Sequence, residues 1–388
     1  MLLNTAVLDI RSADFAFVKK LVDAGGLARC ATEDLPYYTQ SDIEGYLKQG
    51  RCTAGGPGNT APLLARAGLK VAVGVILGKG RYDGFDIQGR TFYDTLVNNG
   101  VDMSATKTHP ILPTGTTFIH ETPDGERGGL AYFPNANNDF IFKHFQRDVE
   151  RIAPKVVYYM YVGLSGRGDA NRGRDLAAFM KWCREKGALT IADSHTLTGN
   201  PGALIAKGKG VPTYKNLRPL LAELDIFFTS VDEARMIRNT LEGKKTDRGE
   251  DVQASIDGFL GFAKTQYMMK SGRPQLFGVT VKNGAYICWN GGDIHFVESK
   301  FMDGGVVDLV GAGDSFRAGV AGYVARNADA FRAGTLDADE AVQVGNLTAT
   351  LFVTAPLDNR YGQILPMEEL IKKAKAKKPR ARKAKAGK

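Results

Sequence analysis

The sequence predicts an α/β fold: a doubly wound, mostly parallel sheet with helices on both faces, plus a small β-sheet lid. Apolar runs alternate with amphipathic stretches over most of the 388 residues. The runs are rich in Val, Ile and Tyr without polar alternation, which is typical of strands buried on both faces of a parallel sheet. One region instead resembles an inserted hairpin. Folds of this class bind their ligands at the carboxyl ends of the strands.

The main sheet is expected from seven apolar runs. These are Thr5–Ile10, Lys70–Ile76, Val156–Val162, Leu189–Asp193, Ile226–Thr229, Leu276–Val281 and Ala285–Trp289. The stretches between them have helical spacing of apolar residues, and the clearest are Gly58–Ala67, Gly89–Asn98, Arg172–Lys186, Val231–Leu241 and Ile256–Met269. This alternation predicts helices that connect the strands and cover both faces of the sheet.

The region that breaks the alternation predicts the lid. Thr114–His120 and Leu130–Phe133 read as two strands joined by the turn-rich segment Thr-Pro-Asp-Gly-Glu-Arg-Gly. Together with the irregular segment Ser12–Cys52 they predict a small second sheet that excludes water from a ligand crevice. The alternative is a surface hairpin without that role. An open apolar face on this sheet would also predict a homodimer formed through the lid.

The net charge of +9 is concentrated near the C-terminus. Residues 372–388 contain ten Lys or Arg and no acid, which leaves 41 basic and 42 acidic residues in the rest of the chain. We therefore expect one domain over residues 1–371, with the lid taken from parts of 10–55 and 110–135, and a disordered tail over 372–388. A solvated tail is the simplest interpretation, and weak binding to nucleic acid or another polyanion is the alternative.

Composition favours a cytoplasmic protein. No run of about 18 apolar residues is present, so we expect no membrane span. The N-terminal segment has no basic region and meets Asp9 early, which argues against a signal peptide. The four cysteines, Cys30, Cys52, Cys183 and Cys288, are scattered and form no C-x-x-C pair. Neither a zinc site nor a disulfide framework is indicated.

Asp308-Leu-Val-Gly-Ala-Gly-Asp-Ser-Phe316 is the strongest motif. A glycine-rich turn that opens a helix presents free N–H groups and the positive end of the helix dipole, both of which suit a phosphate. Asp314 lies beside this predicted anion site, where a carboxylate repels phosphate but accepts a proton from an attacking hydroxyl. Phosphoryl transfer needs little besides positioning, charge neutralisation and such a base. The simpler interpretation is that Asp314 only stabilises the helix dipole.

A second glycine-rich segment, Gly55-Gly-Pro-Gly-Asn-Thr-Ala61, opens the predicted helix Gly58–Ala67. Its glycines permit a ligand to approach the backbone, and Asn59 offers a donor and an acceptor to a polyol. Read alone, the segment is a glycine-rich helix start.

Together these motifs resemble those of the PfkB-type carbohydrate kinases, a ribokinase-like family. The C-terminal signature of that family is Asp-Thr-x-Gly-Ala-Gly-Asp-x-Phe, and Asp308–Phe316 repeats it with Leu309 in place of threonine. The N-terminal signature, Gly-Gly-x-x-x-Asn-x-Ala, is similar to Gly55–Ala61 with the asparagine one position early. Further similar segments are Asp86–Gly89, Asn99–Asp102, Thr114–Thr117, Asp124–Arg127, Ala192-Asp193 and Val279–Gly284. The resemblance spans about Thr5 to Leu365.

The resemblance implies a kinase that uses ATP and Mg²⁺ to phosphorylate a hydroxyl group of a sugar, or of a nucleoside as the alternative. It implies that Asp314 is the catalytic base and that Gly311, Ala312 and Gly313 form the anion hole. It assigns substrate binding to Asp9, Gly55, Gly56 and Asn59, and nucleotide binding to Thr280, Lys282, Gly284 and Asn346. It places Glu233 near magnesium through water, and Asp308 near a monovalent cation such as K⁺.

Two departures from the family pattern bear on activity. The Asn-x-x-Glu element of the family stands here as Ser230-Val-Asp-Glu233, and Leu309 removes a hydroxyl beside the anion hole. These departures keep open a non-catalytic sugar- or nucleotide-binding protein, against which Asp314 argues. A Walker-type NTPase is disfavoured because no Gly-x-x-x-x-Gly-Lys-Ser/Thr string occurs, and Gly78-Lys-Gly80 lacks the third glycine of a dinucleotide site. The neutral body of the chain argues against a DNA-binding protein.

Overall fold

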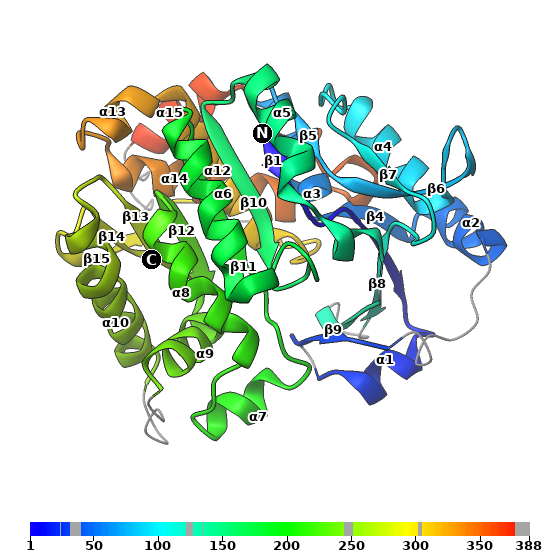
Figure 1. Ribbon diagram of the computed structural model, residues 1–388, viewed down its shortest axis with the longest axis horizontal. Helices are drawn as coiled ribbons and strands as arrows, with labels where there is room; N and C mark the ends of the chain where they lie inside the picture. Colours follow the sequence, from blue (N-terminus) through cyan, green and yellow to red (C-terminus); the bar gives the residue numbers. More distant parts are fainter. Residues whose placement is uncertain are drawn as a thin grey trace, which may run out of the picture.

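The computed structural model describes residues 1–23, 25–31, 40–121, 127–133, 135–243, 251–301 and 305–376. A large sheet runs through the molecule with helices on both of its faces, and a smaller sheet lies at one side (Figure 1). The predicted fold class is therefore confirmed. No helix in the described part of the chain has the length and apolar composition needed to cross a membrane.

The main sheet has eight strands, and six of them are parallel. In sheet order they are β15 (Ile294–Glu298), β14 (Gly284–Trp289), β13 (Leu276–Val281), β12 (Ile226–Ser230), β11 (Leu189–Ser194), β10 (Val156–Val162), β1 (Leu2–Leu3) and β5 (Val73–Gly74). Only β14 and β15 run antiparallel to their neighbours. The carboxyl ends of the six parallel strands consequently meet at one edge.

Two predicted strands lie wholly or partly outside the main sheet. We predicted Thr5–Ile10 as the first strand of the main sheet, but that position belongs to β1, and β2 (Val7–Ser12) pairs in the smaller sheet. Asn4 and Thr5 have φ of 72° and 48°, and this left-handed turn redirects the chain out of the main sheet. The predicted strand Lys70–Ile76 likewise divides: β5 stays in the main sheet. The strand β6 (Ile76–Tyr82) pairs with β7 (Lys107–His109) in a separate two-stranded sheet.

Helices cover both faces of the main sheet, with separate apolar layers on each side. One layer contains α3 (Pro57–Arg66), α12 (Ala312–Arg326) and α14 (Ala338–Val353), and the other contains α5 (Phe142–Ile152), α6 (Arg174–Glu185), α9 (Val231–Glu242) and α10 (Val252–Ala263). The remaining helices are α1 (Ala16–Leu21), α2 (Gln40–Lys48), α4 (Ile87–Val97), α7 (Pro201–Ala206), α8 (Leu217–Leu220), α11 (Met269–Ser271), α13 (Ala328–Arg332) and α15 (Met367–Lys375).

Two glycines let α12 and α14 pack closely. A Cβ added at Gly319 would lie 2.7 Å from the carbonyl oxygen of Val344, and one at Gly345 would lie 2.9 Å from that of Phe316. Larger residues at these positions would push the helices apart. This contact fixes the position of α12 against α14, and with it the position of the glycine-rich turn that precedes α12.

The smaller sheet confirms the predicted lid architecture. Its strands, in order, are β3 (Leu27–Arg29), β9 (Arg127–Tyr132), β8 (Gly115–Glu121), β2 (Val7–Ser12) and β4 (Cys52–Gly55). The predicted hairpin is formed by β8 and β9, and residues 122–126 of its turn lie outside the described residues. The segment Ser12–Cys52 is less irregular than we expected, because it contains β3 and the helices α1 and α2.

The outer face of the lid sheet is covered. Phe118 and Phe133, on the lid, are 2% and 5% exposed, because α1 packs over this face with Phe15. The rings of Phe15 and Phe118 are 5.3 Å apart at their centres, and Tyr46 of α2 extends the cluster. Our homodimer prediction assumed an open apolar face, and that assumption was wrong for the described residues. The dimer stays a prediction without that support.

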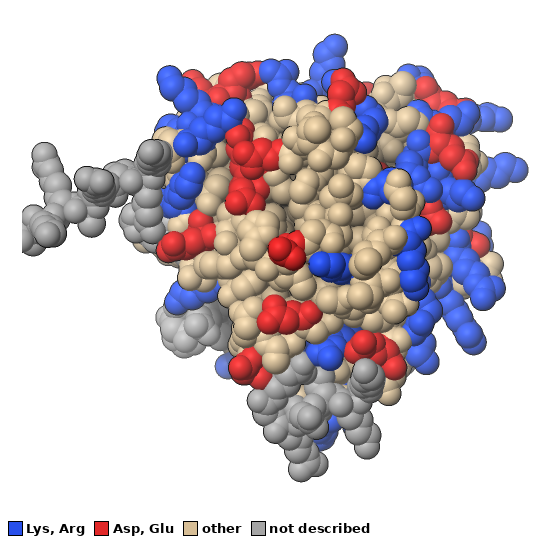
Figure 2. Space-filling view, turned by 90° about the vertical axis from the view of Figure 1, so that its left-hand side faces the viewer, with Lys and Arg blue, Asp and Glu red and all other residues tan. Residues whose placement is uncertain are grey.

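Charged side chains of both signs lie on the face of the molecule drawn in Figure 2. Figure 2 shows acidic and basic groups interspersed on the face turned to the viewer, as the near-neutral composition of residues 1–371 leads us to expect.

The predicted boundary of the basic tail was too early, because α15 continues to Lys375. Ala374 is 1% exposed, and its carbonyl oxygen accepts a hydrogen bond of 2.8 Å from Lys300. Residues 377–388 lie outside the described part.

We predict that deletion of residues 377–388 leaves the melting temperature unchanged, whereas deletion of 372–388 lowers it. The longer deletion removes the end of α15, the buried Ala374 and the hydrogen bond from Lys300, which is worth about 1 kcal/mol. Calorimetry on both truncated proteins tests this. Equal melting temperatures for the two would show that the last turn of α15 adds no stability.

Candidate active site

A cavity of about 550 Å³ lies between the main sheet and the lid. The lid strands contribute Val7, Asp9, Leu27, Thr117, Leu130 and Tyr132 to its wall. The carboxyl ends of β10, β11 and β12, or the turns after them, contribute Tyr161, Ser194, His195, Thr196 and Ser230. The turn before α12 and the start of that helix contribute Leu309–Asp314. The cavity is therefore at the edge where a doubly wound fold is expected to bind ligands.

The glycine-rich turn ends at Gly311, which adopts a left-handed conformation with φ of 87° and caps α12. A Cβ there would lie 2.9 Å from the ring of Phe352 and 3.1 Å from the amide nitrogen of Asn59, so only glycine fits. The N–H of Ala312 already donates to Leu309 (3.1 Å), which argues against its predicted part in the anion hole. Within the described residues, the N–H of Gly313 has no acceptor and stays available at the positive end of the helix.

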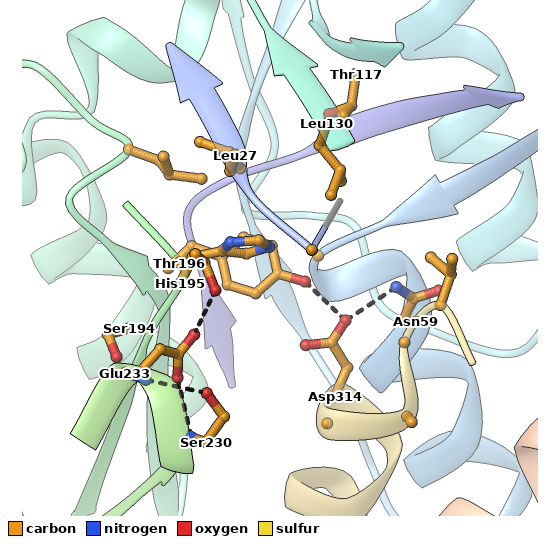
Figure 3. Close-up of a pocket in the computed structure, with 18 of the residues that line it drawn as sticks. Leu27, Asn59, Thr117, Leu130, Ser194, His195, Thr196, Ser230, Glu233 and Asp314 are labelled. Carbon is orange, nitrogen blue, oxygen red and sulfur yellow. Dashed lines mark hydrogen bonds between the residues drawn. The ribbon is translucent and has the colours of Figure 1, made fainter. Parts of the chain in front are cut away.

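Asp314, in the first turn of α12, is 4% exposed and is held by three donors. Its Oδ2 accepts hydrogen bonds from Nδ2 of Asn59 (2.9 Å) and from the hydroxyl of Tyr161 (2.7 Å). Its Oδ1 accepts one from Nη2 of Arg317 (2.9 Å). Figure 3 shows Asn59 and Asp314 facing each other across the cavity wall, joined by one of these bonds.

Arg317 lies between two buried carboxylates. Besides the contact with Asp314, its Nε lies 2.8 Å from Oδ2 of Asp193 and 2.9 Å from the hydroxyl of Tyr158. The Tyr158 hydroxyl donates to the same Asp193 oxygen at 2.7 Å. Complete burial raises the pKa of Asp193 to about 6, against the opposing effect of the Arg317 cation.

Tyr161 reaches the site through a backbone irregularity. Its φ is 60°, which is rare for an aromatic residue, and the pairing of β10 with β11 shifts register between Tyr159 and Val162. This bulge directs the N–H of Tyr161 to Oδ1 of Asp193 at 2.6 Å, while the hydroxyl reaches Asp314. Asp193 and Asp314 therefore both hold Tyr161 in place, the first through its backbone N–H and the second through its hydroxyl.

The predicted substrate-binding residues come together on the lid side. Asp9 lies in the middle of β2 and is 5% exposed. A Cβ at Gly55 would lie 2.5 Å from Oδ2 of Asp9, so this glycine makes room for the carboxylate. Gly56 has φ of 60° and ψ of −124°, a conformation that only glycine adopts easily, and a Cβ there would lie 2.3 Å from Thr5 O.

Glu233 lies on the opposite wall in a capping box at the start of α9. Its Oε2 accepts bonds from the hydroxyl of Thr229 (2.7 Å) and the N–H of Ser230 (3.0 Å), and Ser230 caps the N–H of Glu233. Its Oε1 is 3.4 Å from the hydroxyl of Thr196 and keeps acceptor capacity toward the cavity (Figure 3). Ser230, a departure from the family pattern, is an efficient N-cap residue.

The predicted nucleotide residues are spread over a wider area. Thr280 lines the cavity, whereas Lys282 is exposed at the β13–β14 turn. Gly284 is required by packing, because a Cβ there would lie 2.2 Å from Val297 O. Asn346 is buried on α14, and its Nδ2 has no hydrogen-bond partner in the described part of the chain.

Asp308 is surrounded by positive charge. Its Oδ2 lies 3.2 Å from a nitrogen of Arg11 and 3.1 Å from one of Arg360. A monovalent cation near Asp308 would share this carboxylate with two guanidinium groups, so the K⁺ site stays a prediction.

Sequence reasoning missed Tyr161, Arg317 and His195 as site residues. His195 lines the cavity, and its ring meets that of Tyr161 edge-on with centres 5.0 Å apart. Its place at the end of a parallel strand was a usable signal, because such ends form the ligand edge of this fold. Arg317 stands next to the C-terminal signature, but nothing local shows that it pairs with Asp193.

A family model for the pfkB family of carbohydrate kinases matches residues 30–360 of the chain. The chain belongs to this family. Its members are phosphotransferases that act on hydroxyl groups, so this pfkB-family protein is a carbohydrate or nucleoside kinase. The family predicted from the two glycine-rich signatures is confirmed.

Solved kinase structures share the fold at low sequence identity. A probable sugar kinase from Rhizobium etli CFN 42 is 18% identical with a TM-score of 0.64, and 96% of each chain is covered. A fructokinase from Xylella fastidiosa with bound ATP is 20% identical with a TM-score of 0.63, covering 96% of this chain and 97% of that one. Adenosine kinase from Anopheles gambiae is 17% identical with a TM-score of 0.65, covering 91% and 94%. No curated protein matches the chain.

Kinases of this family use ATP, typically with Mg²⁺, and the residues present fit these groups. The free N–H of Gly313 suits a phosphoryl oxygen, and the unpartnered Nδ2 of Asn346 offers a donor to a nucleotide. Oε1 of Glu233 can accept from a water molecule on magnesium.

We predict that Gly56→Ala destabilises the pfkB-family fold more than Gly68→Ala. Gly68 has φ of 84° but open space around it, so alanine there costs about 1–2 kcal/mol for the left-handed backbone alone. At Gly56 the clash with the Thr5 carbonyl is added. Urea unfolding of both variants measures the difference, and equal losses would mean that the contact with Thr5 imposes no constraint.

Proposed function

We propose that this kinase transfers the γ-phosphoryl group of ATP to a hydroxyl group of a sugar, with Asp314 as the general base. The observation that carries the proposal is the position of Asp314: its carboxylate lines the cavity within one helical turn of the free N–H of Gly313. A base and an anion site at one helix start are what phosphoryl transfer requires.

Some residues of the site act on the sugar hydroxyl, and others act on the phosphoryl group and the nucleotide. Asp314 accepts the proton of the sugar hydroxyl, whose oxygen then bonds to phosphorus as ADP leaves with the electrons of the broken P–O bond. The N–H groups of Gly313 and Gly311 stabilise charge on the transferred group. When bound, Mg²⁺ neutralises the phosphate oxygens, and Glu233 holds its water. We assign Thr280, Lys282, Gly284 and Asn346 to the nucleotide, and of these Thr280 lines the cavity.

The sugar is held from the lid side in this proposal. Asp9 accepts hydrogen bonds from sugar hydroxyls, and the backbone at Gly55 and Gly56 permits close approach. Asn59 contacts Asp314 through its Nδ2, which leaves its amide oxygen for the substrate. Closure of the lid excludes water. The cytoplasmic location, like these roles, stays a prediction.

A nucleoside is the second candidate substrate, and the apolar part of the wall favours it. Leu27, Leu130 and Leu164 line the cavity together with the ring of Tyr132. Phe133, next to Tyr132 in the chain, instead packs against Phe118 on the outer face of the lid. A base could rest on this wall while its ribose reaches Asp9.

We predict that ATP consumption by the full-length protein depends on an acceptor from one of these two classes. The test is a panel of hexoses, pentoses and nucleosides with MgATP, in which ADP release is coupled to NADH oxidation. Turnover with hexoses alone assigns a sugar kinase, and turnover with nucleosides alone assigns a nucleoside kinase. No turnover with any acceptor, combined with measurable binding, would replace the proposal by a non-catalytic binding protein.

We predict that Asp314→Asn lowers kcat by at least about 100-fold, the usual lower contribution of a general base. The variant also loses charge-assisted bonds from Tyr161 and Arg317, so its melting temperature falls. Rates are therefore compared at a temperature where circular dichroism shows both proteins folded. Normal turnover of the folded variant would remove Asp314 as the base.

A further inference from the structure

The buried groups around Asp314 leave it little freedom. A carboxylate has about four acceptor positions. Oδ2 uses two of them, for Asn59 and Tyr161, and Oδ1 uses one, for Arg317. Among the described residues, the single acceptor position that stays open is therefore on Oδ1. In Figure 3 the oxygen of Asp314 without dashed lines points toward the side of the cavity where Glu233 lies.

We propose that Arg317 and Tyr161 are positioning residues of the phosphoryl-transfer reaction: they hold Asp314 in one orientation and present Oδ1 to the substrate hydroxyl. The inference rests on the proposed function, and it adds two residues that lie outside the signatures by which the family was identified. Neither residue needs to touch the substrate for this role.

Asp193 is what allows Arg317 to stay in place during the reaction. When Asp314 takes the hydroxyl proton it becomes neutral, and a guanidinium with no other partner would be left as an uncompensated buried charge. The Arg317 side chain is 11% exposed and that of Asp193 is 0% exposed, so water compensates little. The 2.8 Å contact with Asp193 supplies the lasting counter-charge.

Tyr161 contributes a neutral donor that does not compete for the proton. Burial raises the pKa of Tyr161 well above its usual value, and the nearby Asp314 charge acts in the same direction. The pKa of Tyr158 is raised in the same way. Among the described residues, Arg317 is faced by Asp193 on β11 and by these two tyrosines on β10, besides Asp314 on its own helix. Near neutral pH both hydroxyls remain donors, and the orientation of Asp314 is preserved.

The first test is Tyr161→Phe, which removes only the hydroxyl. A hydrogen bond to a charged group is worth enough to lower kcat by about 10- to 100-fold, with KM nearly unchanged. Tyr159→Phe is the matched control, because Tyr159 is the same residue type on the same strand, is also buried, and packs in the apolar layer on the other face of the sheet. Its turnover should equal that of the wild type.

The second test is the pH profile of Arg317→Lys and Arg317→Met. Methionine removes the positive charge that lies 2.9 Å from Oδ1 of Asp314, so the acidic limb of log kcat/KM should move to higher pH. Lysine keeps the charge, so the limb should stay within about half a unit of the wild type while kcat falls, because the two-pronged contact is lost. A purely structural arginine would lower the melting temperature and leave the limb where it is.

The outcomes separate this inference from the proposed function. All rates are measured with the panel acceptor that gives the highest turnover. If Asp314→Asn loses activity but Tyr161→Phe matches the wild type, and Arg317→Met keeps the acidic limb, the positioning role is wrong and the base assignment stands. If Arg317→Met does not fold, Tyr161→Phe and Arg317→Lys decide alone. If Asp314→Asn keeps full turnover, both proposals fall.

Discussion

Arg317 between Asp193 and Asp314 is the constraint on which the site depends. Buried charges persist only when they are paired, and a carboxylate that loses its partner here would be strongly destabilising. Asp193 sits at the end of β11 and is completely buried, whereas Asp314 and Arg317 sit on α12. The ion pairs therefore tie the start of α12 to the carboxyl edge of the sheet, and the close packing of Gly319 and Gly345 holds the rest of that helix.

The features that could be predicted from the sequence are those with a local signal. Strand and helix alternation has one, and so does the turn Gly311–Gly313 before a helix. Tyr161 has none: its contact with Asp314 spans 153 residues and depends on a bulge that pairing with β11 creates. The transfer of β2 to the lid likewise depends on left-handed turns at Asn4 and Thr5. Ala312 was predicted to belong to the anion hole, but its N–H donates to the carbonyl oxygen of Leu309 and is not free.

The two departures from the family pattern, Ser230 and Leu309, differ in whether the structure explains them. Ser230 completes a capping box with Glu233, so a short side chain at this position stabilises the start of α9 while the carboxylate stays on the cavity wall. Leu309 is 56% exposed at the mouth of the cavity and makes no comparable contact that explains it. The structure therefore explains Ser230, whereas it does not explain Leu309, which lines the cavity.

Backbone conformations with positive φ lie on both sides of the base, and the one at Tyr161 is strained. Tyr161 and Gly56 both have φ of 60°, and a Cβ at Gly56 would lie 3.5 Å from the Tyr161 ring. At Tyr161 this conformation costs about 1–3 kcal/mol and persists only when surrounding contacts impose it, whereas glycine adopts it at little cost. Here the contacts are the bonds from Tyr161 to Asp193 and Asp314, and the pairing of β4 with β2 that ends at Gly55. Relaxing either position would move the tyrosine hydroxyl or the Asn59 amide away from Asp314. The strained backbone at Tyr161 therefore lies next to the contact that orients the carboxylate of Asp314.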